Sequence, residues 1–453
     1  MQDSDSFQVE YIREAFHYQS LFAGSTMVFK IDFPVTEDPA FPVLMHDLAL
    51  LAKLGFRIVI VPGAKEWIDS VLMEYDIPSP YIGDTRLTTE AAIRFVQMAA
   101  FHVAARFMTA LSVDQVDAVI GNFIRSRGLG VLDGVDMEHT GRVEKIHTES
   151  INHILNYGGV PILPCIGWSA AGKPYNVLSD EIALTTSAAL NAEKLFIVFA
   201  HDGILSSRYW VPENAAIGEN GRVIRLTPQE AAQVLEAEKS RAAQSEGEQA
   251  GPEADKGMRD LRLALRASQS GVDRVHLIDG RQPGTLIREL FSNLGSGTMV
   301  YTDEYESIRS LQSSDIPAIL RIMEPLMQQG TLIRRTAQDI QDKIHDYSVF
   351  VIDGSIHACG ALHNWGESQG EIAAVAVDPA YSDMGLGRRI VHYLINRAIS
   401  QGLKRVFALT ISTQDWFESL GFKESTVASL PEEKRKRYDP VRKSKVFALA
   451  LGR

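Results

Sequence analysis

The first 300 residues alternate between strand patterns and helical patterns. Residues 27–31 and 57–61 are short, nearly continuous runs of apolar residues, as expected for strands covered on both faces. Residues 41–54, between them, carry apolar residues at helical spacing. The strand pattern returns at residues 160–166, 195–199 and 272–278. This alternation predicts an α/β fold, with a parallel sheet and helices on both sides.

A short acidic stretch at residues 301–306 interrupts the pattern, which then restarts. We interpret this stretch as a linker between a domain at residues 1–300 and another at residues 307–453. Residues 236–257 are also polar, but a buried-type strand follows them. We therefore interpret them as a solvated helix end and a flexible loop within the first domain.

The second domain mixes helices with strands that differ in length and spacing. A helix is predicted over residues 315–329, with Asp315 as its N-cap. Asp353-Gly354 is typical of a hairpin turn between two strands. The other predicted elements are strands at 348–352, 357–363, 371–377, 405–410 and 446–451, and a helix at 385–400.

Composition limits the functional classes. The chain has 453 residues and a net charge of −12, which argues against a nucleic-acid partner. Two cysteines are too few for a disulfide framework or a four-cysteine zinc site, and we expect no metal. The acidic start resembles neither a secretory signal nor a transit peptide, and no apolar run suits a membrane span. We therefore expect a soluble cytoplasmic protein.

A glycine-spaced loop, Gly385-Leu386-Gly387, follows the strand that ends near Pro379 and opens an amphipathic helix. Glycines let backbone N–H groups approach an anion closely, and a helix N-terminus adds partial positive charge. The loop therefore suits a pyrophosphate. A plain strand–loop–helix connection is the alternative interpretation.

The surroundings of this loop resemble the GNAT family of acetyltransferases over roughly residues 307–453. The stretch Val375-Ala376-Val377-Asp378-Pro379 precedes the loop, and residues 407–410 and 416–422 follow it in the family's order. The resemblance implies acetyl-CoA as co-substrate. The implied contacts are backbone N–H groups of Ala374, Val375 and Val377 for the thioester and pantetheine, and Asp383, Gly385, Gly387 and Arg388 for the phosphates. Ser382 stands where the family usually has Gln or Arg, which leaves Arg388 as the alternative phosphate contact.

Acetyl transfer to an amine requires a neutral amine, and a nearby carboxylate can remove its proton. Glu371 begins the strand before the loop, so it is our candidate general base; a solvent-facing strand-end glutamate is the alternative. The leaving thiolate needs a proton, for which many family members use a tyrosine. Phe417 occupies that position here, and Thr410 is the nearest candidate hydroxyl.

The domain order, together with several stretches of the second domain, resembles the bacterial N-acetylglutamate synthases. These stretches are residues 308–309, 329–335, 370–373, 416–417, 430–432 and 442–446. The resemblance implies L-glutamate as the acceptor, and arginine forks bind carboxylates well. Arg335 and Arg442 are the matching positions, with Arg334 and Lys445 as close alternates. For any single one, a surface ion pair is the alternative.

Six stretches of the first domain match one known family: residues 86–88, 121–123, 159–164, 173–177, 192–195 and 202–203. On these stretches, residues 7–300 resemble the amino-acid kinase family, which implies a three-layer fold around a parallel sheet. A working kinase needs two glycine-rich turns around the transferring phosphate. Here these turns are Lys30-Ile31-Asp32-Phe33 and Val61-Pro62-Gly63-Ala64. Asp32 places negative charge where phosphate is expected. We therefore predict little or no kinase activity, although Lys30 and Asp180 are retained.

Arginine-sensitive members of that family bind arginine between the N-terminal helix and the late strand–helix region. The matching residues are Tyr18, Lys194, His276, Glu289, Gly295 and Gly297. A carboxylate such as Glu289 can pair with a guanidinium, whereas a lone His276 is also typical of a core. The resemblance implies feedback inhibition by L-arginine. It further implies a homo-hexamer joined by N-terminal helices, which Phe7, Tyr11, Phe16 and Leu21 permit.

Three other functions stay open at this point: acetylation of another amine such as a polyamine or protein lysine, a non-catalytic arginine sensor, and retained kinase activity. Two arginines near the acceptor argue against cationic amines. The sequence does not fix the direction of the arginine effect or the oligomer.

Overall fold

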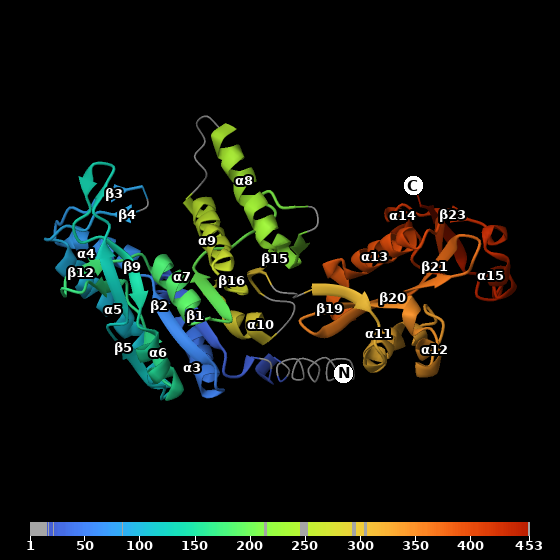
Figure 1. The fold of residues 1–453 in the computed structure, drawn as a ribbon, viewed down its shortest axis with the longest axis horizontal. Coiled ribbons are helices and arrows are strands. Elements are labelled where there is room, and N and C mark those ends of the chain that lie inside the picture. The colour runs from blue at the N-terminus through green and yellow to red at the C-terminus, as the bar shows by residue number, and fades with distance from the viewer. Residues whose placement is uncertain are drawn as a thin grey trace. The chain divides into compact units, whose positions relative to one another are not determined.

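The computed structural model describes residues 16, 18–20, 22–83, 85–212, 215–244, 252–291, 296–302 and 306–451. The chain forms two compact units, Met1–Asp303 and Glu304–Arg453 (Figure 1). Each unit has its own sheet and its own hydrophobic core.

A nine-stranded sheet forms the centre of the first unit, in the order β14-β15-β17-β16-β13-β1-β2-β10-β5. Its members are β1 (Thr26–Ile31), β2 (Arg57–Pro62), β5 (Ala118–Ile120), β10 (Val160–Ile162), β13 (Lys194–Phe199), β14 (Ala216–Ile217), β15 (Val223–Leu226), β16 (Arg274–Asp279) and β17 (Thr298–Tyr301). Neighbouring strands run parallel except at β14–β15 and β16–β17. The predicted parallel sheet is confirmed, and β13 and β16 are buried along their whole length.

Helices surround this sheet. They are α2 (Phe33–Thr36), α3 (Phe41–Lys53), α4 (Lys65–Glu74), α5 (Ile93–Val113), α6 (Thr148–Asn156), α7 (Ser179–Ala189), α8 (Pro228–Gln244), α9 (Pro252–Gln269) and α10 (Thr285–Phe291), with the 3-10 turn η1 (Glu219–Gly221). Among the described residues, α5 alone is long and apolar enough to cross a membrane by length and composition. It buries Val96, Val103 and Phe107 in the core of this unit, as a core helix does.

The predicted strand at residues 160–166 was wrong as a single element. Val160–Ile162 forms β10 of the central sheet, whereas Ile166–Trp168 forms β11 of a separate four-stranded sheet, β12-β11-β6-β9. Pro164, which lacks an N–H, falls between them, and a short turn closes there because the Ile166 N–H bonds to the Pro164 carbonyl at 2.7 Å. The other strands outside the central sheet are β3 (Tyr81–Ile82), β4 (Thr85–Arg86), β6 (Ile124–Gly128), β7 (Val131–Leu132), β8 (Val135–Asp136), β9 (Gly141–Ile146) and β12 (Pro174–Asn176).

The second unit contains a seven-stranded sheet in the order β18-β19-β20-β21-β22-β24-β23. The strands are β18 (Glu306–Ser310), β19 (Tyr347–Ile352), β20 (Ser355–Asn364), β21 (Gln369–Val377), β22 (Arg405–Thr410), β23 (Lys423–Ser425) and β24 (Lys445–Ala450). Its helices are α11 (Ile316–Gln328), α12 (Ala337–Gln341), α13 (Leu386–Ser400), α14 (Gln414–Ser419) and α15 (Glu432–Lys436), with 3-10 turns η2 (Ser313–Asp315), η3 (Ile344–Asp346), η4 (Pro379–Met384) and η5 (Val427–Ser429). The predicted fold class is confirmed in both units.

Helices α11 and α13 cover opposite faces of this sheet (Figure 1). Asp353 and Gly354 both have positive φ, so the predicted hairpin turn is confirmed. Asp315 does occupy the N-cap position of α11, but the predicted capping by its side chain was wrong. Its carboxylate instead accepts from the Gln312 N–H at 2.8 Å and pairs with Arg309.

Strand β21 leaves its neighbour β22 soon after the two begin to pair. Their parallel register covers Gln369–Arg405, Gly370–Val406 and Glu371–Phe407. Beyond this point β21 continues against β20, and β22 continues against β24 as far as Thr410. The two strands therefore open into a notch whose last paired residues are Glu371 and Phe407.

A bulge in β21 follows shortly after Glu371, its last residue paired with β22. The register with β20 shifts between Cys359 and Ala361, and Ala374 has φ of 53°. An alanine in this left-handed region carries strain of about 1–3 kcal/mol, which the surrounding pairing sustains. Ala374 is also buried, so the strain lies inside the core.

Replacing Ala374 by valine tests this bulge. A β-branched residue is disfavoured at positive φ and lacks space there, so Ala374→Val should lower the free energy of unfolding by at least about 1–3 kcal/mol. Ala374→Gly should preserve or raise it. Urea unfolding of the full chain measures both, with Ala373→Val, at ordinary φ, as the matched control. Equal stability of the two valine variants would contradict the strained bulge.

Candidate functional site

The notch between β21 and β22 collects the residues that the sequence singled out for chemistry. Glu371 lies at its vertex, and Thr410 lies at the far end of β22. Helix α13 begins after the loop that follows β21. A carboxylate, a hydroxyl and a helix N-terminus therefore surround one opening in the sheet.

Glu371 is buried, with its side chain 7% exposed. Lys434 Nζ donates to both carboxylate oxygens, at 2.6 and 2.7 Å. The Trp365 indole N–H donates to Oε2 at 2.8 Å. The alternative of a solvent-facing strand-end glutamate does not fit this environment.

Glu371 lies on the α11 face of the sheet. Its neighbour Ile372 packs on the α13 side, and successive strand residues face opposite sides. His363 is its register partner on β20, and the His363 ring lies 6.0 Å from the Tyr347 ring. The α11 face therefore continues from Glu371 to Tyr347.

Arg335 reaches the same face. Burial raises the pKa of Tyr347, while the positive charge of the nearby Arg335 guanidinium acts in the opposite direction. Burial likewise raises the pKa of the Cys359 thiol to about 12, again with Arg335 opposing. Arg335 also donates to the Ile333 carbonyl at 3.0 Å. The guanidinium thus lies on the side of the sheet that Glu371 occupies.

The other three predicted acceptor-site cations differ in environment. Arg442 donates to the Gly330 and Thr331 carbonyls at 3.0 and 2.6 Å, so it ties its loop to the segment that carries Arg335. Arg334 is exposed. Lys445 pairs with Glu424 at 3.2 Å, and both side chains are about half exposed. Arg335 and Arg442 are therefore linked through one loop, whereas Arg334 and Lys445 are not part of that contact.

Thr410 organises the turn that leads into α14. Its Oγ1 accepts from the Thr413 N–H at 3.0 Å and lies 2.7 Å from Thr413 Oγ1. The hydroxyl is mostly buried at the end of β22. Phe417, at the position of the family's tyrosine, packs between the rings of Trp416 and Phe422.

The glycine loop has the backbone geometry that the sequence predicts. Gly385 has φ of 70° and is the N-cap of α13. A Cβ added to Gly387 would lie 3.3 Å from Trp416 and 3.4 Å from Val377. Arg388 is exposed. The side chain of Asp383 lies outside the described residues.

Asp378 fixes the start of this loop. Its carboxylate accepts from the Ala380 N–H at 3.2 Å and lies 3.8 Å from His357 Nδ1. Burial would raise the pKa of Asp378, but the nearby His357 ring and the hydrogen bond from the Ala380 N–H outweigh it and hold the pKa below its usual value. The loop is therefore anchored by an ionised side chain.

The predicted arginine-site residues converge in the first unit. Lys194 Nζ lies 4.0 Å from the centre of the Phe22 ring, which stacks on Tyr18. His276 Nδ1 lies 2.7 Å from Glu289, and the other Glu289 oxygen accepts from the Gly297 N–H at 2.8 Å.

Burial would raise the pKa of Glu289, but these hydrogen bonds hold it below its usual value. The predicted partner Gly295 lies outside the described residues, as do Phe7, Tyr11 and Leu21. Phe16 is exposed.

The two turns at the positions of the kinase family's glycine-rich turns hold an internal ion pair. Lys30 is buried and pairs with Asp32 at 2.7 Å and Asp180 at 3.0 Å. Burial would lower the pKa of Lys30, but these carboxylates raise it. A Cβ at Gly63 would meet Asp32 Oδ1 at 3.0 Å, so this carboxylate lies between the two turns, where the sequence placed it.

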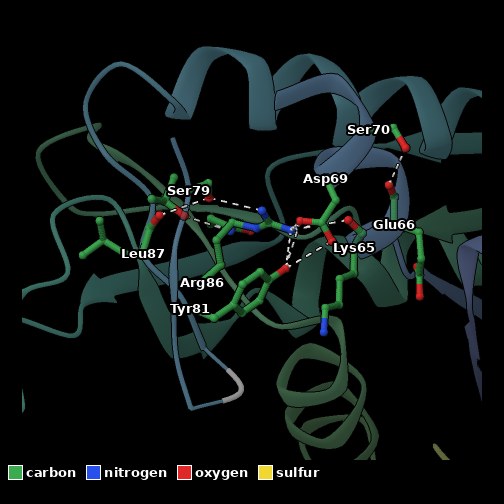
Figure 2. Close-up of polar contacts among 10 residues, drawn as sticks. Lys65, Glu66, Asp69, Ser70, Ser79, Tyr81, Arg86 and Leu87 are labelled. Atoms are coloured by element: carbon green, nitrogen blue, oxygen red, sulfur yellow. Dashed lines mark hydrogen bonds and ion pairs between the residues drawn. The ribbon is translucent and has the colours of Figure 1, made fainter. Parts of the chain in front are cut away.

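Arg86 of this unit is also buried among internal partners (Figure 2). Its guanidinium pairs with Asp69 at 2.6 Å and donates to Ser79 and Tyr81. Burial raises the pKa of Tyr81, so its hydroxyl stays protonated. Within the described residues, no cluster of His, Cys, Asp or Glu could hold a metal ion.

Sequence reasoning missed Lys434 and Trp365, the two partners of Glu371. Lys434 sits in the run Lys434-Arg435-Lys436-Arg437, which looks like an exposed basic helix. The adjacent stretch, residues 430–432, is part of the family resemblance, but the sequence pattern does not distinguish Lys434 from the other basic residues of the run.

Comparison with known proteins agrees with this architecture. Residues 34–279 match the amino acid kinase family, and residues 317–422 match the acetyltransferase (GNAT) family. The amino-acid acetyltransferase of Vibrio cholerae is 32% identical, over 98% of both chains. The amino-acid acetyltransferase of Pectobacterium atrosepticum is 33% identical over the full length of both chains.

A solved structure covers both units. N-acetylglutamate synthase from Neisseria gonorrhoeae, complexed with coenzyme A and L-arginine, is 31% identical and covers 98% of this chain and 99% of its own, with a TM-score of 0.79. A second structure of that enzyme, with coenzyme A and N-acetyl-glutamate, has a TM-score of 0.59 at 32% identity over the same shares of both chains. This chain, which joins an amino acid kinase family region to a GNAT region, belongs to the amino-acid acetyltransferase family.

Proposed function

We propose that this enzyme transfers the acetyl group of acetyl-CoA to the α-amine of L-glutamate and that L-arginine inhibits it. One observation carries the proposal: Glu371 lies at the vertex of the notch between β21 and β22, and Arg335 lies near Tyr347 on the same face of the sheet. A base that shares a face with a guanidinium suits an acceptor that has both an amine and a carboxylate. The related Neisseria gonorrhoeae structure with coenzyme A and N-acetyl-glutamate supports the same assignment.

Each part of the notch has a role in this proposal. The backbone of β21 at Ala374, Val375 and Val377 would hold the thioester and pantetheine, where β22 has left the ladder. The glycine loop and the first turn of α13 would bind the phosphates. Arg335 and Arg442 would anchor the carboxylates of glutamate.

The chemistry follows from these positions. Glu371 takes a proton from the α-ammonium, and the neutral nitrogen attacks the thioester carbonyl. The C–N bond forms as the C–S bond breaks, the nitrogen releases its second proton, and coenzyme A leaves as a thiolate that takes up one proton. Thr410 is the hydroxyl proposed to hydrogen-bond the sulfur, because it lies at the end of β22, the strand that borders the notch. Backbone N–H groups stabilise the oxyanion.

The arginine site in this proposal is the cluster around Glu289. Glu289 presents a carboxylate for a guanidinium, and Lys194 and Arg274 bring positive charge beside Phe22 for the carboxylate of the ligand. The related structure with L-arginine supports it. We also propose a homo-hexamer, on the family resemblance of the N-terminal segment.

Replacing the base is the first test. Glu371→Gln keeps the shape of the side chain but cannot accept the proton, so kcat with glutamate should fall by roughly 10²–10⁴-fold. Release of free thiol from acetyl-CoA measures this rate. A rate within a few-fold of wild type would remove Glu371 from the mechanism. In the same assay, faster turnover of spermidine or a lysine peptide than of glutamate would contradict the acceptor.

Two adjacent arginines provide a matched pair. Arg335→Gln removes a partly buried guanidinium, so kcat/KM for glutamate should fall by about 10–100-fold, the effect of one charge-assisted hydrogen bond. Arg334→Gln should change it little, because Arg334 is exposed. Steady-state kinetics at varied glutamate measure both. Equal losses would show that Arg335 has no special contact with the acceptor.

The arginine effect is tested at Glu289. L-arginine should lower the rate of the wild-type enzyme, and Glu289→Gln should raise the arginine concentration for half inhibition by about tenfold or more. Arginine should also raise the melting temperature of wild type more than that of the variant. Activation by arginine, or an unchanged inhibition curve for the variant, would contradict this part of the proposal.

A further inference from the structure

The carboxylate proposed as the general base is already occupied in this structure. Lys434 Nζ lies 2.6 and 2.7 Å from the two oxygens of Glu371, and the Trp365 N–H occupies one of them as well. The side chains of Lys434 and Glu371 are 13% and 7% exposed, so little water screens the pair. A base in this state holds a cation where the ammonium of the acceptor must bind.

Two ammonium groups cannot share one carboxylate at this distance without strong repulsion. The other charged groups near Glu371 do not relieve the conflict. His363, its register partner, is engaged with Asp346 at 2.6 Å, and Arg437 lies 5.4 Å from the centre of the Trp365 ring. Lys434 must therefore leave Glu371 before the proton transfer.

A buried ammonium leaves one anion readily only when it gains another. Among the described acidic residues nearby, Glu432 pairs with Lys436, Glu367 accepts from the Glu432 N–H, and Glu433 is exposed to water. The acceptor of the proposed reaction brings a second carboxylate of its own. Lys434 lies on α15, a helix of five residues, so its displacement requires no change in the sheet.

We infer that Lys434 is a positioning residue that locks Glu371 in the free enzyme, and that the side-chain carboxylate of the bound amino acid draws Lys434 away and releases the base. This inference rests on the proposed function. It makes the acceptor's carboxylate a condition for catalysis as well as for binding. An amino acid without that carboxylate finds the base still occupied.

Trp365 reports on the lock. Its ring lies 5.0 Å from Lys434 Nζ, and its N–H donates to Oε2 of Glu371. When Lys434 leaves, the indole keeps the carboxylate oriented and loses one of the two cations beside its ring, while Arg437 remains. The emission of Trp365 is therefore expected to change when glutamate binds.

The decisive experiment compares L-glutamate with its neutral isostere L-glutamine. In the wild type, glutamine must displace Lys434 without offering it a side-chain carboxylate. Lys434→Met removes the lock, so kcat/KM for glutamine should rise about tenfold. The value for glutamate should fall about tenfold or more, because its side-chain carboxylate loses Lys434 as a partner. A simple carboxylate anchor, or a merely structural lysine, would not raise the glutamine value. A glutamine value at or below that of wild type would overturn the lock.

Two variants control this result. Lys434→Arg keeps a cation on Glu371 and should restore the preference for glutamate. Arg437→Met removes the other cation beside the Trp365 ring. Among the described contacts, Arg437 has none with Glu371, so this variant should not raise kcat/KM for glutamine. Thermal unfolding verifies that each variant folds.

Fluorescence gives an independent measurement that needs no variant of Lys434. The emission of wild type minus that of Trp365→Phe should shift on adding glutamate and stay constant on adding glutamine. No shift with glutamate would overturn the displacement of Lys434. If the proposed function is wrong, the wild-type enzyme will not turn over glutamate. Failure of the lock shows as normal glutamate turnover with no gain for glutamine.

Discussion

The separation of β21 from β22 is the constraint on which the site depends. Both strands keep a full partner on their outer side, β20 for β21 and β24 for β22, so neither needs the other beyond Glu371 and Phe407. The bulge at Ala374 sits just after that last pair. Because each strand is held from outside, the notch stays open without any element inserted between the strands. Glu371 is placed at its vertex by pairing alone.

The elements around the site could be predicted from the sequence, but their separation could not. Periodicity indicates β21, β22 and α13 within one or two residues of their observed bounds. The register between strands depends on residues far apart in the chain, and alternation does not reveal where pairing stops. The ion pair between Glu371 and Lys434 joins residues 63 positions apart. The family resemblance identified Glu371, whereas only the fold brings Lys434 to it.

The sheet of the kinase-like unit carries two groups of charged residues at opposite ends of its parallel strands. Lys30 and Asp279 lie near the carboxyl ends of the parallel strands, where phosphate would bind, and the Lys30 ammonium is neutralised by Asp32. Lys194 and Arg274 begin β13 and β16, at the opposite ends of the strands. Substitutions at one edge change charge there and leave the other edge intact, since the buried strands between them are rigid. Retention of the fold therefore does not require retention of kinase chemistry.

Buried lysine–carboxylate pairs occur in both units, and their surroundings give them opposite roles. Lys30 is almost wholly buried on a central strand and contacts two carboxylates, so no ligand can offer it a better environment. Lys434 has one carboxylate partner among the described residues, is partly exposed, and lies on a short helix at the edge of its unit. An ion pair of this kind is stable only while each charge lacks an alternative partner. A ligand that supplies one carboxylate can therefore open the pair at Glu371, while the pair at Asp32 stays closed.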